Sequence, residues 1–152
     1  MKIHDKNLVV CPSCDHHEYN NPRPTNGVIF ENEKGEILLV GRKYDPKKGY
    51  WDIPGGFVNI EETMEESVKR EVKEELNISL KKFTYLCSKR DRYQYKGQNY
   101  HVLMFVFVSK DSLQDVSIGD DVSDVKFFPK DKIPFEKLAF DGVKEAIKDY
   151  IS

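Results

Sequence analysis

The sequence predicts one α+β domain, a sandwich in which helices cover sheet faces. Three observations support this fold class. Strand-like apolar runs occur on both sides of a central segment, in which Met64, Val68, Val72 and Leu76 recur every four positions. A second amphipathic segment ends the chain at residues 138–151. The length of 152 residues fits a single domain with an ordinary core.

The strands are expected where the apolar runs occur. Residues 28–30 and 37–40 are short apolar runs joined by a polar segment with Lys34-Gly35, which is typical of a β-hairpin. Beyond the central segment the strand-like runs are residues 80–88, 100–109 and 122–128, with a turn at Lys96-Gly97.

The central segment also carries helix start and stop signals. Asn59 and Thr63 are alternative N-cap residues, and the acidic residues after them suit the positive end of a helix. Asn77 is expected to end the helix in the left-handed conformation. Pro54-Gly55-Gly56, just before the helix, predicts a turn with a closely bent backbone.

Composition excludes several classes of protein. A hydrophobic content of 39% and a charged content of 33% are typical of a soluble globular chain. The net charge of −2 argues against general nucleic-acid binding. No apolar run has membrane-spanning length, and the N-terminus lacks a signal-peptide core. Three cysteines are an odd, low count that favours the cytoplasm, with Cys87 expected in the core and His4 on the surface.

One motif is more specific than any other feature of the chain. Residues 55–78 read GGFVNIEETMEESVKREVKEELNI, which places Gly56, Glu62, Arg70-Glu71, Val72, Glu74-Glu75 and Ile78 at fixed spacing. This resembles the Nudix box, G-x5-E-x7-R-E-U-x-E-E-x-G-U, where U is a bulky apolar residue. Only the second glycine differs, because Asn77 stands there. The resemblance implies an α/β/α sandwich with a mixed sheet over residues 23–152, in which the box forms a loop–helix–loop, and leaves residues 1–22 as a separate segment.

Three glutamates of the motif share one helix face. Glu71, Glu74 and Glu75 stand at i, i+3 and i+4, so their charges repel each other. A hard divalent cation removes the repulsion, since Mg²⁺ favours oxygen ligands. The alternative is a solvated acidic face balanced by neighbouring basic residues. The resemblance favours Mg²⁺ or Mn²⁺, and it implies Glu71 and Glu75 as core ligands, Glu74 as the third and the Gly56 carbonyl as a further ligand.

The resemblance also implies an activity. Nudix hydrolases cleave the pyrophosphate bond of a nucleoside diphosphate linked to another group, such as ADP-ribose, a dinucleoside polyphosphate, NADH or a nucleoside triphosphate. It implies in addition that Glu62 pairs with Arg70 to hold the loop against the helix. The general base is left open between a box glutamate and an acid of a later loop, where Asp121 and Asp124 are candidates. The alternative for those two aspartates is a polar turn.

Candidate substrate-binding residues surround the box. Basic residues suit phosphates and aromatic residues suit a stacked base, and the candidates are Arg23, Arg42, Tyr50, Trp51, Gly55 and Gly56. The aromatic ones have core packing as their alternative. Two other functions remain. A non-catalytic module that senses a nucleotide has no need for the complete glutamate set. An RNA 5′-end hydrolase would be expected to carry a basic stripe.

The N-terminal segment holds a C-x2-C knuckle, Cys11-Pro12-Ser13-Cys14, followed by His16 and His17. It resembles the second half of the zinc ribbon that precedes the Nudix domain of NADH pyrophosphatases, without the first cysteine pair. Cys11, Cys14 and one or both histidines are therefore candidate ligands of a tetrahedral Zn²⁺. Two chains sharing one ion would form a homodimer, and the alternative is a loop without metal.

Overall fold

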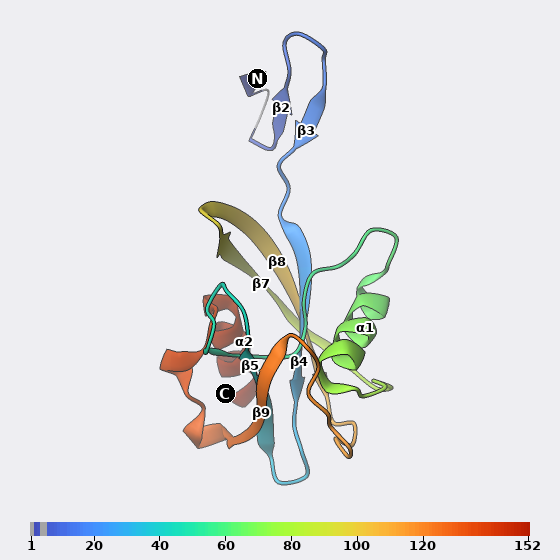
Figure 1. Cartoon of the computed structure of the whole chain (residues 1–152), viewed down its shortest axis with the longest axis vertical. Coiled ribbons are helices and arrows are strands. Elements are labelled where there is room, and N and C mark those ends of the chain that lie inside the picture. The colour runs from blue at the N-terminus through green and yellow to red at the C-terminus, as the bar shows by residue number, and fades with distance from the viewer. Residues whose placement is uncertain (1, 4–5) are drawn as a thin grey trace.

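The computed structural model describes residues 2–3 and 6–152. The surface position expected for His4 therefore lies outside the described residues. The described chain forms a small N-terminal sheet and a larger body, which an extended segment connects (Figure 1).

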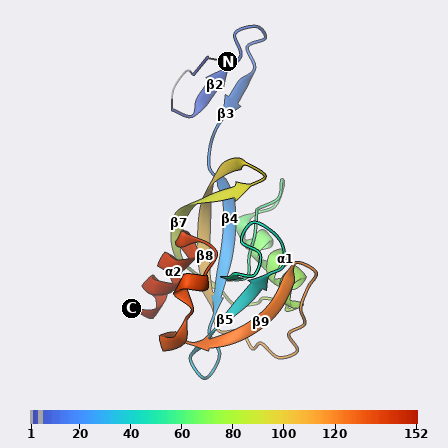
Figure 2. The same ribbon diagram turned by 60° about the vertical axis from the view of Figure 1, so that its left-hand side comes forward.

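The N-terminal sheet contains β1 (Lys2–Ile3), β2 (Leu8–Val10) and β3 (His17–Tyr19), paired antiparallel in that order. It stands clear of both helices in the two views of the whole chain (Figures 1 and 2). The C-x2-C knuckle lies in the turn between β2 and β3.

Two three-stranded sheets form the body. The first has the order β4 (Arg23–Phe30), β8 (Gln98–Ser109) and β7 (Thr84–Tyr95), with β4 parallel and β7 antiparallel to β8. The second is antiparallel, with the order β6 (Trp51–Asp52), β5 (Glu36–Arg42) and β9 (Val122–Pro129). Helix α1 (Met64–Leu76) and helix α2 (Asp141–Ile151) lie on opposite sides of these strands (Figures 1 and 2). Short 3-10 turns at Lys130–Lys132 and Phe135–Lys137 precede α2. The predicted α+β sandwich with a mixed sheet is confirmed.

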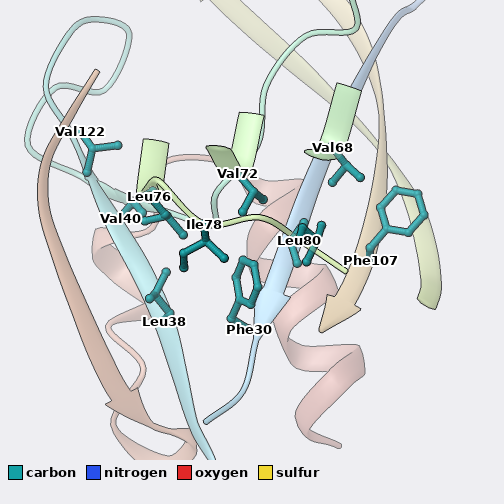
Figure 3. Close-up of a cluster of buried hydrophobic side chains, with 11 residues drawn as sticks. Phe30, Leu38, Val40, Val68, Val72, Leu76, Ile78, Leu80, Phe107 and Val122 are labelled. Atoms are coloured by element: carbon teal, nitrogen blue, oxygen red, sulfur yellow. The ribbon is translucent and has the colours of Figure 1, made fainter. Parts of the chain in front are cut away.

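Helix α1 begins and ends where its sequence signals predict. Thr63 is the N-cap, and its side chain and that of Glu66 form a reciprocal capping box. Val68, Val72 and Leu76 are fully buried. Figure 3 shows them gathered with apolar residues of the strands. Asn77 ends the helix in the left-handed conformation, with φ of 56°.

A second core lies under α2. Val143, Ala146 and Ile147 of this helix are buried together with Ile29 of β4 and Val106 of β8. The two cores hold the two helices on opposite faces of the strands. No helix among the described residues is long and apolar enough to cross a membrane.

The prediction of a β-hairpin at residues 28–40 is wrong, because the two strands do not pair with each other along their length. A turn does join β4 and β5, with Gly35 N–H donating to Asn32 O at 3.0 Å. The two strands nevertheless belong to different sheets, and a single bridge between Glu31 and Ile37 links them. Both strands are buried for most of their length, so each pairs along a sheet of its own.

Candidate active site

The Gly-Gly loop is attached to the free edge of β4. Val28 N–H donates to Pro54 O at 2.8 Å, and Asn26 N–H donates to Gly56 O at 2.9 Å. Gly55, between these contacts, has φ of 151°, and a Cβ atom at this position would lie 2.1 Å from Asn26 O. Only glycine allows so close an approach of two backbones.

Two glutamates of α1 face this loop. Gly55 N–H donates to Glu75 Oε2 at 3.0 Å. A Cβ atom on Gly56 would lie 2.6 Å from Glu71 Oε1, so the backbone of Gly56 lies directly against the Glu71 carboxylate. Burial raises the pKa of Glu71, and it raises the pKa of Glu75 well above its ordinary range. The loop and the helix therefore bring together two carboxylates and backbone atoms in a poorly solvated place.

Arg70 forms hydrogen bonds with three glutamates of the box. It forms a bidentate pair with Glu62, with Nη2–Oε1 at 2.7 Å and Nε–Oε2 at 3.0 Å, and its Nη2 also donates to Phe57 O at 3.0 Å. The predicted pair between loop and helix is therefore present, and the Arg70 guanidinium lowers the pKa of Glu62 to about 2. Arg70 Nη1 also donates to Glu71 at 2.8 Å and to Glu74 at 3.1 Å.

The three helix glutamates consequently do not converge. Glu71 has 14% of its side chain exposed and Glu74 has 58%, because Glu74 lies on the solvent side of Arg70. Among the residues that the structure describes, no three His, Cys, Asp or Glu side chains are grouped to hold a metal ion. Of the three helix glutamates, Glu71 and Glu75 are the ones that lie against the Gly55-Gly56 backbone.

These groups line a cavity of about 420 Å³. Of the predicted site residues, those in its wall are Gly55, Gly56, Glu71, Glu75, Arg42 and Asp121. Arg42 is held by Asp52 at 3.0 Å and by Pro46 O at 2.7 Å, and its guanidinium lies 5.0 Å from the ring centre of Phe140. Burial raises the pKa of Asp52 to about 6, although the Arg42 charge opposes the shift.

The loop that carries Asp121 is fastened to α1. Gly119 N–H donates to Glu75 O at 2.9 Å, and a Cβ atom on Gly119 would lie 1.9 Å from Glu74 O. On the other side, Lys43 N–H donates to Asp121 O at 3.4 Å. Asp121 therefore reaches the cavity wall from the same helix end that carries Glu75.

Besides Glu62, Arg70 and Glu74 of the box, four predicted residues do not line this cavity. The Arg23 guanidinium lies 4.7 Å from the ring centre of Tyr100, and Trp51 packs edge-to-face against Phe128 at 5.2 Å. The ring of Tyr50 is covered by two lysines, at 5.2 and 5.7 Å. Asp124 of β9 is the fourth, and its side chain accepts a hydrogen bond from Val125 N–H at 2.8 Å.

The wall also contains residues that the sequence did not single out. Asp52, Asp91 and Phe140 line the cavity. Asp52 adjoins the Pro54-Gly55-Gly56 turn in sequence, so its position was a usable signal. Asp91 accepts a hydrogen bond from Gly142 N–H at 2.6 Å and so joins β7 to the start of α2. Nothing local in the sequence marks Asp91 or Phe140, because both are brought to the site by tertiary packing.

The knuckle lies apart from this cavity. Cys11 N–H donates to His16 O at 2.9 Å, and Cys11 Sγ lies 3.1 Å from Ser13 Oγ. The hydrogen bond with Ser13 lowers the pKa of Cys11 to about 6. Cys14 is exposed, and His17 contacts Asp15 at 3.4 Å. These residues provide no group of three ligands within the described chain, so the expected zinc site is not supported.

Comparison with known proteins identifies the family of this chain. The model of the NUDIX domain matches residues 21–150. An ADP-ribose pyrophosphatase of Methanocaldococcus jannaschii is 39% identical over 128 residues, which is 83% of this chain and 70% of that protein. An NAD-capped RNA hydrolase NudC of Pseudomonas aeruginosa is 29% identical over 88% of this chain, but this chain covers only 46% of it. The crystal structure of a MutT NUDIX hydrolase from Burkholderia pseudomallei superposes with a TM-score of 0.74, at 28% identity, over 85% of this chain and 98% of that one. The chain therefore belongs to the NUDIX domain family.

Proposed function

We propose that this protein hydrolyses the pyrophosphate bond of a nucleoside diphosphate linked to another group, with ADP-ribose as the first candidate substrate. The observation that carries the proposal is the pair Glu71 and Glu75, two partly buried carboxylates held against the Gly55-Gly56 backbone inside a cavity. The likeness to an ADP-ribose pyrophosphatase supports the choice of substrate. The three unpaired cysteines support a cytoplasmic location as part of the same proposal.

The donor set fits a divalent cation. Burying two carboxylates together is unfavourable unless a positive charge compensates them, and Mg²⁺ is usually bound by one or two carboxylates and several waters. Glu71, Glu75 and the Gly56 carbonyl would hold Mg²⁺ or Mn²⁺ here. Glu74 would act at longer range from its place beside Arg70. When bound, such a cation neutralises the pyrophosphate and lowers the pKa of water.

The protein's own groups would orient the substrate. Arg42 is fixed by two hydrogen bonds in the cavity wall, so its guanidinium is in place to meet a phosphate. Phe140 stacks with Tyr93 at 5.8 Å, and both line the cavity, whereas Tyr50 and Trp51 do not, so Phe140 and Tyr93 are our candidates for contact with a planar base. Asp121 is our candidate for the group that accepts the proton of the attacking water, because it is the later-loop acid that reaches the wall.

A substrate panel tests the proposal. Purified protein is incubated with ADP-ribose, NADH, a dinucleoside polyphosphate and nucleoside triphosphates, each with Mg²⁺ and with Mn²⁺. Products are separated by anion-exchange chromatography. We expect AMP and ribose 5-phosphate from ADP-ribose, and no products when EDTA is present. Tight binding of ADP-ribose in calorimetry without any turnover across the panel would favour the alternative of a nucleotide-sensing module.

An RNA substrate is the second candidate. The likeness to an NAD-capped RNA hydrolase favours it, although this chain covers under half of that protein. An NAD-capped oligonucleotide in the same panel would show whether the cavity admits a longer substrate.

A further inference from the structure

A buried hydrogen bond joins β4 to α1 at the wall of the candidate active site. Among the described residues, the buried polar side chains are those of Asn26, Ser67 and Ser109. Two of them face each other, since Asn26 Nδ2 donates to Ser67 Oγ at 2.8 Å. Asn26 is 4% exposed and Ser67 is fully buried. This contact joins residues 41 positions apart in the chain.

Ser67 lies on the same side of α1 as the two carboxylates at the cavity wall. Ser67, Glu71 and Glu75 are spaced at i, i+4 and i+8, so they lie along one side of the helix. A hydrogen bond at Ser67 therefore restrains both the rotation of α1 about its axis and its height along β4.

Asn26 holds the other half of the site as well. Its backbone N–H donates to Gly56 O at 2.9 Å, and its carbonyl oxygen is the atom that excludes a Cβ at Gly55. The side chain of one residue thus fixes the helix that carries the carboxylates, while its backbone fixes the loop that faces them.

The asparagine is an unfavourable choice for packing alone. Its Oδ1 is buried and has no hydrogen-bond partner in the described part of the chain. A buried acceptor without a partner destabilises the folded state, whereas an apolar side chain of similar size at the same position does not. Since a leucine would fill this space without that penalty, packing does not account for the amide.

We propose that Asn26 is a positioning residue, whose amide sets the register of Glu71 and Glu75 against the Gly55-Gly56 backbone through Ser67. The inference rests on the proposed hydrolysis. Its physical basis is that a displacement of about 1 Å in a catalytic group can lower turnover about 100-fold. Asn26 is one of the residues that line the cavity, but its Nδ2 is directed to Ser67, so its loss should lower kcat while leaving KM within about threefold.

The test compares Asn26→Leu with Ser67→Ala, which breaks the same hydrogen bond from the other side. Ser109→Ala is the matched control, because Ser109 is also a buried serine whose hydroxyl is hydrogen-bonded, to Lys82 O at 2.6 Å, but it does not line the cavity. We expect kcat to fall about 10- to 100-fold in both test variants. Ser67 Oγ also donates to Phe57 O and accepts from Arg70 Nη2, each at 3.4 Å, so Ser67→Ala removes these contacts together with the shared one. We therefore expect the double variant to be no worse than Ser67→Ala alone. Asn26→Leu should melt at or above the wild-type temperature, and Ser109→Ala should melt lower with kcat within twofold.

A second measurement does not depend on turnover. The Gly55 amide is the donor to Glu75, so its hydrogen-exchange rate, followed by NMR, reports on the position of the helix against the loop. We expect faster exchange in Asn26→Leu and Ser67→Ala but not in Ser109→Ala. If wild-type protein hydrolyses nothing, the proposed function fails while the exchange rates still decide this inference. Unchanged Gly55 exchange in both test variants, or kcat within twofold of an active wild type, would overturn it.

Discussion

Replacing Glu75 with Gln should move stability and activity in opposite directions. Glutamine has nearly the shape of glutamate and can still accept the hydrogen bond from Gly55 N–H. Because burial raises the pKa of Glu75 well above its ordinary range, its charged form is unfavourable in the metal-free protein. We therefore expect metal-free Glu75→Gln to melt at or above the wild-type temperature.

Turnover should fall by about two to four orders of magnitude in the same variant. The structure places two carboxylates, Glu71 and Glu75, at the cavity wall, so the substitution removes half of the charge that these two provide. A unit charge about 4 Å from an opposite charge contributes about 4 kcal/mol at an effective dielectric constant of about 20. That energy corresponds to about 1,000-fold in rate, in the middle of the expected range.

The assay combines steady-state hydrolysis of the best panel substrate with melting curves in EDTA. Glu65→Gln is the matched control, since it removes the same charge from an exposed position of α1 outside the cavity wall, and it should stay within about twofold in turnover. Near-wild-type turnover in Glu75→Gln would refute the assignment. A large drop in the melting temperature of metal-free Glu75→Gln would refute the inference that the Glu75 carboxylate destabilises the folded state.

Three further outcomes are expected. The pKa of Asp52 is raised to about 6, so the folded state binds more protons than the unfolded state between about pH 4 and 6. Urea unfolding of metal-free protein should therefore show a free energy of unfolding that falls by about 2 kcal/mol as the pH rises from 4.5 to 7, and a rise over this window would contradict the burial of Asp52. Gly119→Ala should destabilise the protein by about 1–3 kcal/mol in the same assay and should also lower kcat, because the added Cβ would lie 1.9 Å from Glu74 O and the Asp121 loop must shift. An unchanged unfolding midpoint would show that the loop adapts freely. Cys11→Ser should leave hydrolysis within about twofold because the knuckle lies away from the cavity. A large loss of activity would show that the two parts are coupled.

The parts of the site that the sequence predicted are those set by local geometry. The Thr63 cap, the apolar stripe of α1 and the left-handed Asn77 depend on residues within a turn or two of each other, and all three are present. The pair of Arg70 with Glu62 is likewise present, at a separation of eight residues.

The parts that it did not predict depend on contacts between distant segments. Helical spacing placed Glu71, Glu74 and Glu75 on one face, but it could not show that Arg70 would lie between Glu74 and the cavity. Phe140 reaches the wall only because α2 packs on β7. The hydrogen bond between Asn26 and Ser67 joins a strand to a helix 41 residues further along the chain, so no local sequence pattern predicts it.

The charge of the cavity bears on the choice between an enzyme and a nucleotide sensor. Arg42 already forms an ion pair with Asp52. Acidic residues outnumber basic ones in the cavity wall, where Asp45, Asp52, Glu71, Glu75, Asp91 and Asp121 stand against Arg42, Lys43 and Arg92. Such a cavity repels a pyrophosphate unless cations enter with it, so substrate affinity and catalysis require the same compensating charge. A module selected only to bind an anionic nucleotide would hold it more simply with basic residues and backbone N–H groups. Two desolvated carboxylates at the cavity wall weaken metal-free binding and destabilise the fold, and hydrolysis is the function that explains both costs.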